Sequence, residues 1–361
     1  VCAMGTLSAA NKPDIPGIDD FSGECHHTGQ WPQEGVSFEG KRVGVIGTGI
    51  MGGPMALNLV KGGFEVMAFN RTPARAEALE SGGVRVAKSI AEVGEACSVV
   101  ITMVPDTPDV LACVEEPGGL AGAMQSGSVL IDMSTVAPGA TRELAGRLAD
   151  RGIAMLDAPV SGGSWGAQSG TLTIMAGGEQ AVFDRCMPVF EAMGKTITLM
   201  GPSGMGQTTK LVNQILVAGT VSAVAEALVF AAAQGADLLK TIEAVAGGAA
   251  GSWQLANLGP RMAQGDFAPG FMVKLQQKDL RLIQEAAQEA HVPLAVTSLA
   301  RQYFTALEAA GGAEHERRAR KLRGNVQLIE TLAELIESDD RLYPIRILGV
   351  RADARDGTPC R

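Results

Sequence analysis

Three glycines, Gly47, Gly49 and Gly52, form a G-x-G-x-x-G sequence that could hold the pyrophosphate of a dinucleotide. The first two glycines let the backbone turn and approach the phosphates, and the third lets a helix pack closely on a strand. Free N–H groups at the start of that helix would donate hydrogen bonds to the anion. We therefore predict dinucleotide binding at Gly47, Gly49, Ile50 and Met51, with a purely structural glycine turn as the alternative.

The residues after the expected second strand bear on which dinucleotide would bind. An acidic side chain there accepts hydrogen bonds from a ribose hydroxyl of NAD, whereas a cation favours the 2′-phosphate of NADP. The chain has Asn70, Arg71 and Thr72 at this place and no carboxylate. Because a guanidinium can pair with phosphate through two hydrogen bonds, we predict that NADP(H) is preferred and that NAD(H) is a second option. The alternative is that Arg71 is a solvated loop residue.

Lys210 is the candidate acid or base beside such a nicotinamide. It lies in residues 204–214, which open a long expected helix, and Asn213 and Gln214 share its helix face. In a mostly apolar cleft, desolvation lowers the pKa of an ammonium group and makes it a competent proton donor near neutral pH. A surface lysine in the first turn of a helix is the alternative, and composition alone leaves both interpretations open.

The more common acid and base residues are poorly placed. The histidines either precede the fold or come late in the helical half, and neither tyrosine is part of a Y-x-x-x-K sequence. These residues are His26, His27, His291, His315, Tyr303 and Tyr343. Their positions argue against a histidine-centred 2-hydroxyacid dehydrogenase and against the short-chain dehydrogenase arrangement.

Ser161, Gly162 and Gly163 could hold a substrate carboxylate. They form a glycine-rich loop after an expected strand, and consecutive backbone N–H groups with a serine hydroxyl can bind a carboxylate without carrying a charge. An ordinary turn is the alternative. Further along, Lys278 and Asp279 fall at the start of an expected helix after a Pro-Gly pair, where simple capping would also account for them.

Alternating strand and helix signals position these candidates. Short buried strands are expected at residues 42–47, 65–70, 98–104, 129–132 and 154–158, and a helix is expected at residues 50–60. Strands that alternate with helices imply right-handed crossovers and a parallel sheet. We therefore predict an α/β fold, with a Rossmann-type parallel sheet domain followed by an all-α domain, joined by a long helix.

The domain boundary is expected near residue 200. Strand signals fade after residues 197–200, and the following helices are interrupted at residues 247–252, at Pro260 and at the Pro269-Gly270 pair. The predicted units are a 1–40 extension, a 41–201 NADP-binding domain, a 202–312 all-α substrate and dimerisation domain, and a 313–361 tail with one amphipathic helix. The Ala-rich helix at residues 204–234 could pack against a second subunit, so we expect a homodimer or homotetramer.

Composition and charge exclude several classes of partner. With 361 residues, a formal net charge of −9 and a pI near 5.1, the chain offers no basic surface for nucleic acid. Its six cysteines never form C-x-x-C, which favours neither a disulfide framework nor a zinc site and fits a reducing, cytoplasmic setting. We expect no metal ion, no signal peptide and no membrane association, and we interpret the apolar residues 215–233 as a buried Ala-rich helix.

Four motifs in order resemble the β-hydroxyacid dehydrogenase family, which includes 3-hydroxyisobutyrate dehydrogenase, tartronate semialdehyde reductase and the glyoxylate/succinic semialdehyde reductases. The motifs are residues 45–59, 157–163, 204–214 and 277–280, and the likeness spans about residues 41–316.

The resemblance implies that Lys210 is the catalytic acid/base, with Asn213 and Gln214 beside it. Many members carry Asn four residues after the lysine, whereas this chain has Gln214 there and Asn213 just before it. That order is similar to the tartronate semialdehyde reductase branch, which favours a small 2- or 3-hydroxy acid and its semialdehyde.

The resemblance also implies the remaining site residues. The substrate set is Ser161, Gly162, Gly163, Phe271 and Asp279. The cofactor set gains Thr135 and Lys278, and we also assign Met103, Val104 and Pro105 to it. After Glu316 the family's final helix gives way to an unfamiliar sequence, which puts C-terminal packing in question.

The N-terminal segment carries a second resemblance. Residues 21–32 fit F-x-G-x-x-x-H-x-x-x-W-P, a fingerprint of Baeyer-Villiger monooxygenases, and residues 40–49 resemble the segment that leads into a nucleotide-binding turn in those enzymes. Because the two resemblances meet in that turn, we interpret the chain as a fusion or chimera joined near residues 47–49. Only about twenty residues precede the fingerprint, so we expect neither an FAD-binding domain nor oxygen-inserting chemistry.

These features together predict an NADP-preferring oxidoreductase that interconverts a small hydroxy acid and its semialdehyde, with Lys210 as proton donor or acceptor. The partner is then a small carboxylate substrate. A non-catalytic NADP-binding scaffold and a protein derived from a flavin monooxygenase are the alternatives. A scaffold has no need of a lysine at position 210, and a bound flavin would be visible in an absorbance spectrum.

Overall fold

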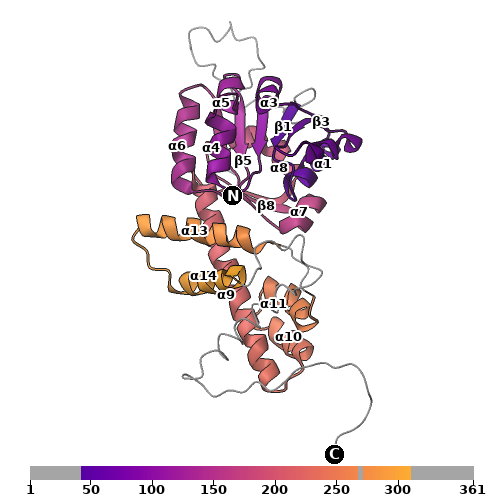
Figure 1. Cartoon of the computed structure of the whole chain (residues 1–361), viewed down its shortest axis with the longest axis vertical. Coiled ribbons are helices and arrows are strands. Elements are labelled where there is room, and N and C mark those ends of the chain that lie inside the picture. Colours follow the sequence, from indigo (N-terminus) through magenta and orange to yellow (C-terminus); the bar gives the residue numbers. More distant parts are fainter. Residues whose placement is uncertain (1–41, 267–270, 310–361) are drawn as a thin grey trace, which may run out of the picture.

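A computed structural model of the chain describes residues 42–266 and 271–309. A domain built on a parallel sheet is followed by a helical part that begins with the long helix α9 (Met205–Ala233). Figure 1 shows α9 running out of the sheet domain and through the helical part. The predicted fold class is therefore confirmed. The predicted N-terminal extension and the tail at residues 313–361, with its amphipathic helix, lie outside the described residues.

The large sheet has six parallel strands in the order β3-β2-β1-β4-β5-β6. They are β1 (Arg42–Ile46), β2 (Glu65–Phe69), β3 (Arg85–Val86), β4 (Val99–Thr102), β5 (Val129–Asp132) and β6 (Ala154–Asp157). The five strands expected from the sequence are all present, and the short edge strand β3 is an addition. Strand order changes direction between β1 and β4, and open α/β sheets bind ligands at the carboxyl ends of the strands beside such a switch point.

Helices cover both faces of this sheet (Figure 1). They are α1 (Gly52–Lys61), α2 (Pro73–Glu77), the 3-10 helix η3 (Glu80–Gly82), α3 (Ile90–Ala96), α4 (Thr107–Glu115), α5 (Leu120–Ala123), α6 (Pro138–Ala149), α7 (Gly163–Ser169) and α8 (Gln180–Glu191). The helix expected at residues 50–60 is α1, which starts two residues later than expected, so Ile50 and Met51 belong to the loop that leads into it.

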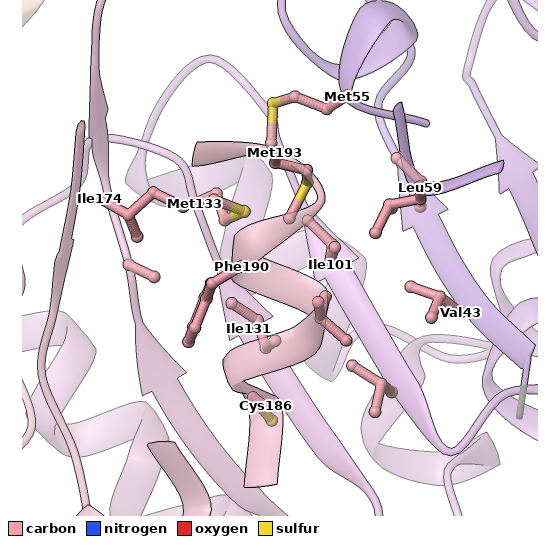
Figure 2. Packing of buried hydrophobic residues seen from close by; sticks show 14 of the residues in the cluster. Val43, Met55, Leu59, Ile101, Ile131, Met133, Ile174, Cys186, Phe190 and Met193 are labelled. Carbon is pink, nitrogen blue, oxygen red and sulfur yellow. The ribbon is translucent and has the colours of Figure 1, made fainter. Parts of the chain in front are cut away.

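Side chains of successive strand residues enter two different apolar cores, because they point to opposite faces of the sheet. One core packs Val43 and Ile131 against α1 and α8, and Figure 2 shows Phe190 of α8 lying among these strand residues. The other core packs Val100 against α3, α4, α5 and α6, including Leu144 of α6. Each such fully buried side chain contributes about 1.5–3 kcal/mol, so the sheet domain has a substantial core of its own.

A second, three-stranded sheet was not distinguished in the sequence. It contains β7 (Val160–Ser161), β8 (Leu172–Ala176) and β9 (Gly194–Leu199) in that order. The strand signal at residues 197–200 corresponds to β9, which pairs with β8 rather than with the large sheet. β7 runs antiparallel to β8 and is only two residues long, which is too short for a hydrophobic periodicity to predict it.

Up to residue 309, where the described residues end, the helical part continues after α9 with five shorter helices. They are α10 (Leu238–Ala246), α11 (Trp253–Asn257), α12 (Gly259–Ala263), α13 (Val273–Glu289) and α14 (Ala295–Ala309). The predicted interruption at residues 247–252 separates α10 from α11, and Pro260 lies in the first turn of α12, where proline is tolerated. The Pro269-Gly270 pair lies outside the described residues.

The expectation that residues 215–233 form a buried helix is only half right. They are helical and form most of α9, whose Ala218 and Ala225 are fully buried against α13 and α14. However, only 28% of the most apolar stretch of α9 is buried, and Leu216 and Phe230 are about two-thirds exposed. By length and composition α9 could also cross a membrane, but its first half carries buried polar residues that contact the sheet domain.

Candidate active site

The glycine loop is shaped by steric limits that the structure makes explicit. Gly47 has a φ of +95°, and a Cβ atom there would lie 2.4 Å from the carbonyl oxygen of Met103. A Cβ at Gly52 would lie 1.9 Å from the carbonyl oxygen of Gly47, so the helix can approach the strand only with glycine here. In contrast, a Cβ at Gly49 would meet nothing nearer than the Nη1 atom of Arg75 at 4.0 Å. Gly47 and Gly52 are required by the fold, whereas Gly49 leaves open space above the loop.

The polar atoms around this loop fit an anionic ligand. The Thr48 N–H donates to Asn70 Oδ1 (3.0 Å), and Asn70 Nδ2 donates to the carbonyl oxygen of Thr72 (2.9 Å), so Asn70 ties the loop to the segment after β2. The Thr48 hydroxyl is buried and has no hydrogen-bond partner among the described residues. Ile50 is half exposed and Met51 is the N-cap of α1, so the predicted cofactor residues surround the start of this helix. An unpartnered hydroxyl and open space over Gly49 are what a dinucleotide pyrophosphate needs.

Two arginines lie beside the loop. The Arg71 side chain is 87% exposed and its Nη1 atom is 3.6 Å from Asp109 Oδ1, so its guanidinium is accessible to a ligand. Arg75, four residues later in α2, is the side chain nearest to the open space at Gly49. The sequence analysis did not select Arg75, although its i,i+4 spacing from Arg71 was visible. The structure therefore offers two cations where a 2′-phosphate was expected.

Lys210 is buried rather than on the surface, so the surface-lysine alternative is wrong. Its side chain lies in α9 and the residue is 8% exposed. The Nζ atom donates a hydrogen bond to the carbonyl oxygen of Val160 (2.7 Å), the residue directly before Ser161. Burial lowers the pKa of Lys210 to about 8, opposed by the nearby charge of Asp279 and reinforced by that of Lys278. The amine is thus a proton donor and acceptor near neutral pH, positioned beside the predicted carboxylate loop.

A hydrogen-bonded group from two helices surrounds this amine. Gln214 Nε2 donates to Asp279 Oδ2 (2.5 Å), and Asn213 Nδ2 donates to Gln214 Oε1 (2.8 Å). Asp279 Oδ1 lies 2.8 Å from Lys278 Nζ, and the Asp279 side chain is 2% exposed. Lys278 and Asp279 lie in the second turn of α13, which begins at Val273. The expectation that they start a helix is therefore wrong, and simple capping does not account for them.

Asp157 and Gln207 hold the start of α9, and the sequence analysis assigned neither of them a role. Asp157 ends β6 and accepts hydrogen bonds from the N–H groups of Gly204 (2.7 Å) and Gln207 (2.8 Å). Burial raises the pKa of this carboxyl group, and these N–H donors oppose the shift. The Gln207 side chain accepts from the Val136 N–H (3.1 Å) and donates to the Ser134 carbonyl oxygen (2.8 Å). In the sequence, the available sign of such a role was the position of Asp157 between an expected strand and the glycine loop at residues 161–163.

The predicted cofactor residues at the ends of β4 and β5 come together. Lys278 Nζ donates to the carbonyl oxygen of Thr135 (2.5 Å), which joins α13 to the loop after β5. The Val104 N–H donates to Ser134 Oγ (3.0 Å), which joins that loop to the segment after β4. Met103 and Val104 are partly buried, and Pro105 is exposed. Hydrogen bonds therefore link α13, the loop after β5 and the segment after β4 into one continuous group.

The predicted carboxylate-binding residues lie where β7 leads into α7. Gly162 and Gly163 have φ angles of +129° and +60°, which side chains rarely adopt, so this loop depends on glycine. Ser161 belongs to β7 and directly follows the carbonyl group that accepts from Lys210. Phe271 is half exposed and follows residues that the structure does not describe.

Two family descriptions match the chain, and together they cover most of the described residues. Residues 42–201 match the NAD-binding domain of 6-phosphogluconate dehydrogenase. Residues 204–320 match the NAD-binding domain of NADP-dependent 3-hydroxyisobutyrate dehydrogenase. The boundary between the two matches falls between β9 and α9.

Individual relatives agree with these matches. The chain is 41% identical over 292 residues to 2-hydroxy-3-oxopropionate reductase of Escherichia coli strain K12, covering 81% of this chain and 98% of the relative. It is 36% identical over 283 residues to NAD-dependent L-serine dehydrogenase of Pseudomonas aeruginosa, covering 76% of this chain and 95% of the relative. A solved structure of Mycobacterium tuberculosis 3-hydroxyisobutyrate dehydrogenase with L-serine superposes with a TM-score of 0.73 at 31% identity, covering 81% of this chain and 99% of that one.

Proposed function

Because the chain belongs to the β-hydroxyacid dehydrogenase family, which includes 3-hydroxyisobutyrate dehydrogenase, we propose that it interconverts a small hydroxy acid and its semialdehyde. As a member of this family it is an NAD(P)-dependent oxidoreductase that acts on a CH–OH group. The finer elements of the proposal are a preference for NADP(H), a small carboxylate substrate, and Lys210 as the proton donor and acceptor.

The buried amine of Lys210 carries this proposal. In the reducing direction it gives a proton to the substrate carbonyl oxygen as that oxygen gains negative charge, and in the oxidising direction the neutral amine takes the proton from the hydroxyl group. Its hydrogen bond to Val160 fixes the amine next to Ser161. A positioned acid or base of this kind contributes typically 10²–10⁴-fold to the rate.

The remaining residues bind and orient the reactants. The nicotinamide cofactor, when bound, supplies or accepts the hydride. Ser161, Gly162 and Gly163 would bind the substrate carboxylate through a hydroxyl and backbone N–H groups. Asp279, held by Gln214, keeps a negative charge near Lys210 that partly offsets the cost of burying the ammonium group. The residues that would hold the cofactor are Gly47, Gly49, Ile50, Met51, Asn70, Arg71, Thr72, Met103, Val104, Pro105, Thr135 and Lys278.

A substrate panel tests the proposed reaction. We expect NADPH oxidation, followed by absorbance, with at least one of glyoxylate, succinic semialdehyde and 2-hydroxy-3-oxopropionate. The relative from Escherichia coli named for the last of these compounds makes it the first choice. Absence of turnover with all three and with the corresponding hydroxy acids in the reverse direction would overturn the proposal.

The NADP(H) preference rests on Arg71 and Arg75, which place positive charge beside the glycine loop; residues 70–75 contain no acidic side chain, although Arg71 also pairs with Asp109. Arg71→Asp should weaken NADPH binding by roughly tenfold relative to NADH, because it replaces a phosphate partner by a like charge. Arg185→Asp on the exposed surface of α8 is the matched control. An unchanged ratio of NADPH to NADH affinities would reject the assignment.

A non-catalytic scaffold is the main rival. Such a scaffold would bind a dinucleotide at the same loop. However, burying the Lys210 ammonium group beside the second glycine loop costs stability, and a scaffold function does not explain that cost. The monooxygenase fingerprint at residues 21–32 lies outside the described residues, and our interpretation of a fusion stays a prediction. A flavin spectrum in the purified protein would contradict our account.

We also propose that the chain forms a homodimer or homotetramer in the cytoplasm. Leu216 and Phe230 of α9, and Val296 and Leu299 of α14, are more than half exposed, which is unusual for large apolar side chains. A second subunit would cover them. Light scattering of the purified protein should give at least twice the mass of one chain, and fractionation of the source cells tests the location.

A further inference from the structure

A row of polar residues crosses the carboxyl ends of three neighbouring strands. In the sheet register Thr102 of β4 pairs with Asp132 of β5, which pairs with Asp157 of β6. All three side chains are fully buried. Asp157 caps α9, as described above, but neither the sequence analysis nor the proposed mechanism gives Asp132 a role. A second buried carboxyl group in this row therefore needs an explanation.

Asp132 is only partly satisfied by its neighbours. Its Oδ1 atom accepts hydrogen bonds from the Thr102 hydroxyl (2.8 Å) and from the Ser134 N–H (3.1 Å). Its Oδ2 atom is buried and has no hydrogen-bond partner among the described residues. A buried carboxyl group with an unpartnered oxygen destabilises the fold, so a purely structural site would favour an amide or an apolar side chain.

The contacts of Ser134 connect Asp132 to the segment after β4 and to helix α9. Ser134 Oγ accepts from the Val104 N–H (3.0 Å), in the predicted cofactor segment after β4. The Ser134 carbonyl oxygen accepts from Gln207 (2.8 Å), one helical turn before Lys210 in α9. Asp132 thus holds a residue, Ser134, that bonds both to the predicted cofactor segment after β4 and to the helix that carries Lys210.

We propose that Asp132 is a positioning residue for the redox site, which in its ionised form fixes Ser134 and thereby sets the cofactor segment after β4 relative to the helix that carries Lys210. This inference rests on the proposed function. An ionised carboxylate accepts hydrogen bonds more strongly than a protonated one, because charge-assisted bonds are about twice as strong as neutral ones. Protonation of Asp132 therefore loosens Ser134, and the geometry between cofactor and Lys210 relaxes.

Burial places this switch within a measurable pH range. It raises the pKa of Asp132 from an ordinary value of 3.8 to about 6, and the charge of Asp157 adds to the shift. The titratable groups that face Asp132 are Asp157 on β6 and the Cys113 thiol on α4, whose own pKa burial raises to about 11. Between pH 4 and 6 the folded chain holds this proton more tightly than the unfolded chain. Ionisation of Asp132 therefore lowers stability as the pH rises through 6, while it supports activity.

The test compares Asp132→Asn with wild type and with Asp150→Asn, an exposed aspartate at the end of α6. At pH 7.5 we expect kcat to fall about 10- to 100-fold and NADPH binding to weaken about tenfold, because small displacements in a site have effects of that size. Wild-type activity should fall as the pH drops through 6, and Asp132→Asn should lack that dependence. From pH 4.5 to pH 7.5 the Tm of Asp132→Asn should rise relative to that of wild type.

A second pair of variants keeps the test decisive if Asp132→Asn folds poorly. Thr102→Val removes one hydrogen-bond donor to Asp132 and should lower kcat, whereas Thr102→Ser keeps the hydroxyl and should restore it to within about twofold. A kcat within twofold of wild type in Asp132→Asn, or parallel losses of Tm and activity with an unchanged pH profile, would overturn the proposal. If wild type turns over no hydroxy acid or semialdehyde, the proposed function fails, and NADPH affinity and the pH dependence of Tm still decide the role of Asp132.

Discussion

The glycine loop at residues 47–52 and the lysine cluster, which consists of Lys210, Asn213, Gln214, Lys278 and Asp279, depend on different parts of the chain. In the loop, Gly52 is limited by Gly47, five residues away, and Gly47 by its positive φ and by Met103 after the neighbouring strand β4. The lysine cluster brings together β7, α9 and α13, so that Lys210 bonds to Val160 and Gln214 to Asp279. The shape of the loop is set by steric limits within the sheet domain, whereas the lysine cluster depends on how the sheet domain and the helical part pack.

The two regions should therefore respond differently to substitution. In the loop, a single added Cβ either clashes with backbone or meets open space, and no neighbour can rearrange to relieve a backbone clash. In the lysine cluster, Lys210 and Gln214 are held by partners that lie at least 50 residues away, so a substitution there changes proton transfer or geometry while the fold remains. Four predictions test this contrast.

The largest expected effect is on proton transfer. Lys210→Ala should lower kcat by about 10²–10⁴-fold, because it removes the proposed acid. NADPH affinity, measured by titration of the purified variant, should stay within about threefold of wild type. Lys195→Ala, at an exposed position of β9, is the matched control and should behave like wild type. Near-normal turnover of Lys210→Ala would discard the catalytic role of the amine.

Two alanine variants of the loop should separate folding from ligand binding. Gly47→Ala should lower the free energy of unfolding by about 3 kcal/mol, since it adds backbone strain at φ +95° to a clash with Met103. Gly49→Ala should leave the free energy of unfolding within about 0.5 kcal/mol of wild type, yet weaken NADPH binding roughly tenfold by filling the space of the pyrophosphate. Urea denaturation and cofactor titration measure both. Equal stabilities of the two variants would contradict this contrast.

The pH dependence of the two reaction directions should have opposite signs. Burial lowers the pKa of Lys210 to about 8, so the protonated donor predominates below pH 8 and the neutral acceptor above it. In steady-state profiles, kcat/KM for reduction should fall up to tenfold per pH unit above 8, whereas kcat/KM for oxidation should rise through the same range and level off. In Lys210→Arg both pH dependences should be absent, because a guanidinium group does not titrate near pH 8. Profiles that move in the same direction would exclude Lys210 as the shared group.

The smallest effect on stability and activity is expected at an exposed ion pair between the helical part and the sheet domain. Arg281 of α13 pairs with Asp106 after β4 (Nη2 to Oδ2, 2.6 Å), and both side chains are partly exposed. Arg281→Ala should lower the free energy of unfolding by no more than about 1 kcal/mol and change kcat/KM less than about threefold, because exposed ion pairs contribute little. Arg147→Ala, which removes a similar pair with Glu115 within the sheet domain, is the control. A tenfold loss of kcat/KM in Arg281→Ala alone would show that this contact helps to set the site.

Much of the site was predictable because its residues lie in short motifs. Gly47, Gly49 and the residues around Ser161 could be assigned from a glycine pattern after a strand. Lys210 was selected from its motif, but its burial was not predictable, because the groups that exclude water from it come from β7 and α13. Asp157 and Gln207 were missed for a similar reason: their partners are about 50 to 70 residues away, and no local spacing indicates them.

The parallel character of the large sheet, five of its six strands and the positions of the glycine turns were predictable from the amino-acid sequence itself, because strand periodicity and the preference of tight turns for glycine act within a few residues. The protonation behaviour of Lys210, the ionisation of Asp132 and the exposure of Leu216 and Phe230 were decided only by the tertiary structure. Desolvation and long-range hydrogen bonds depend on which distant segments meet, and a linear pattern does not contain that information.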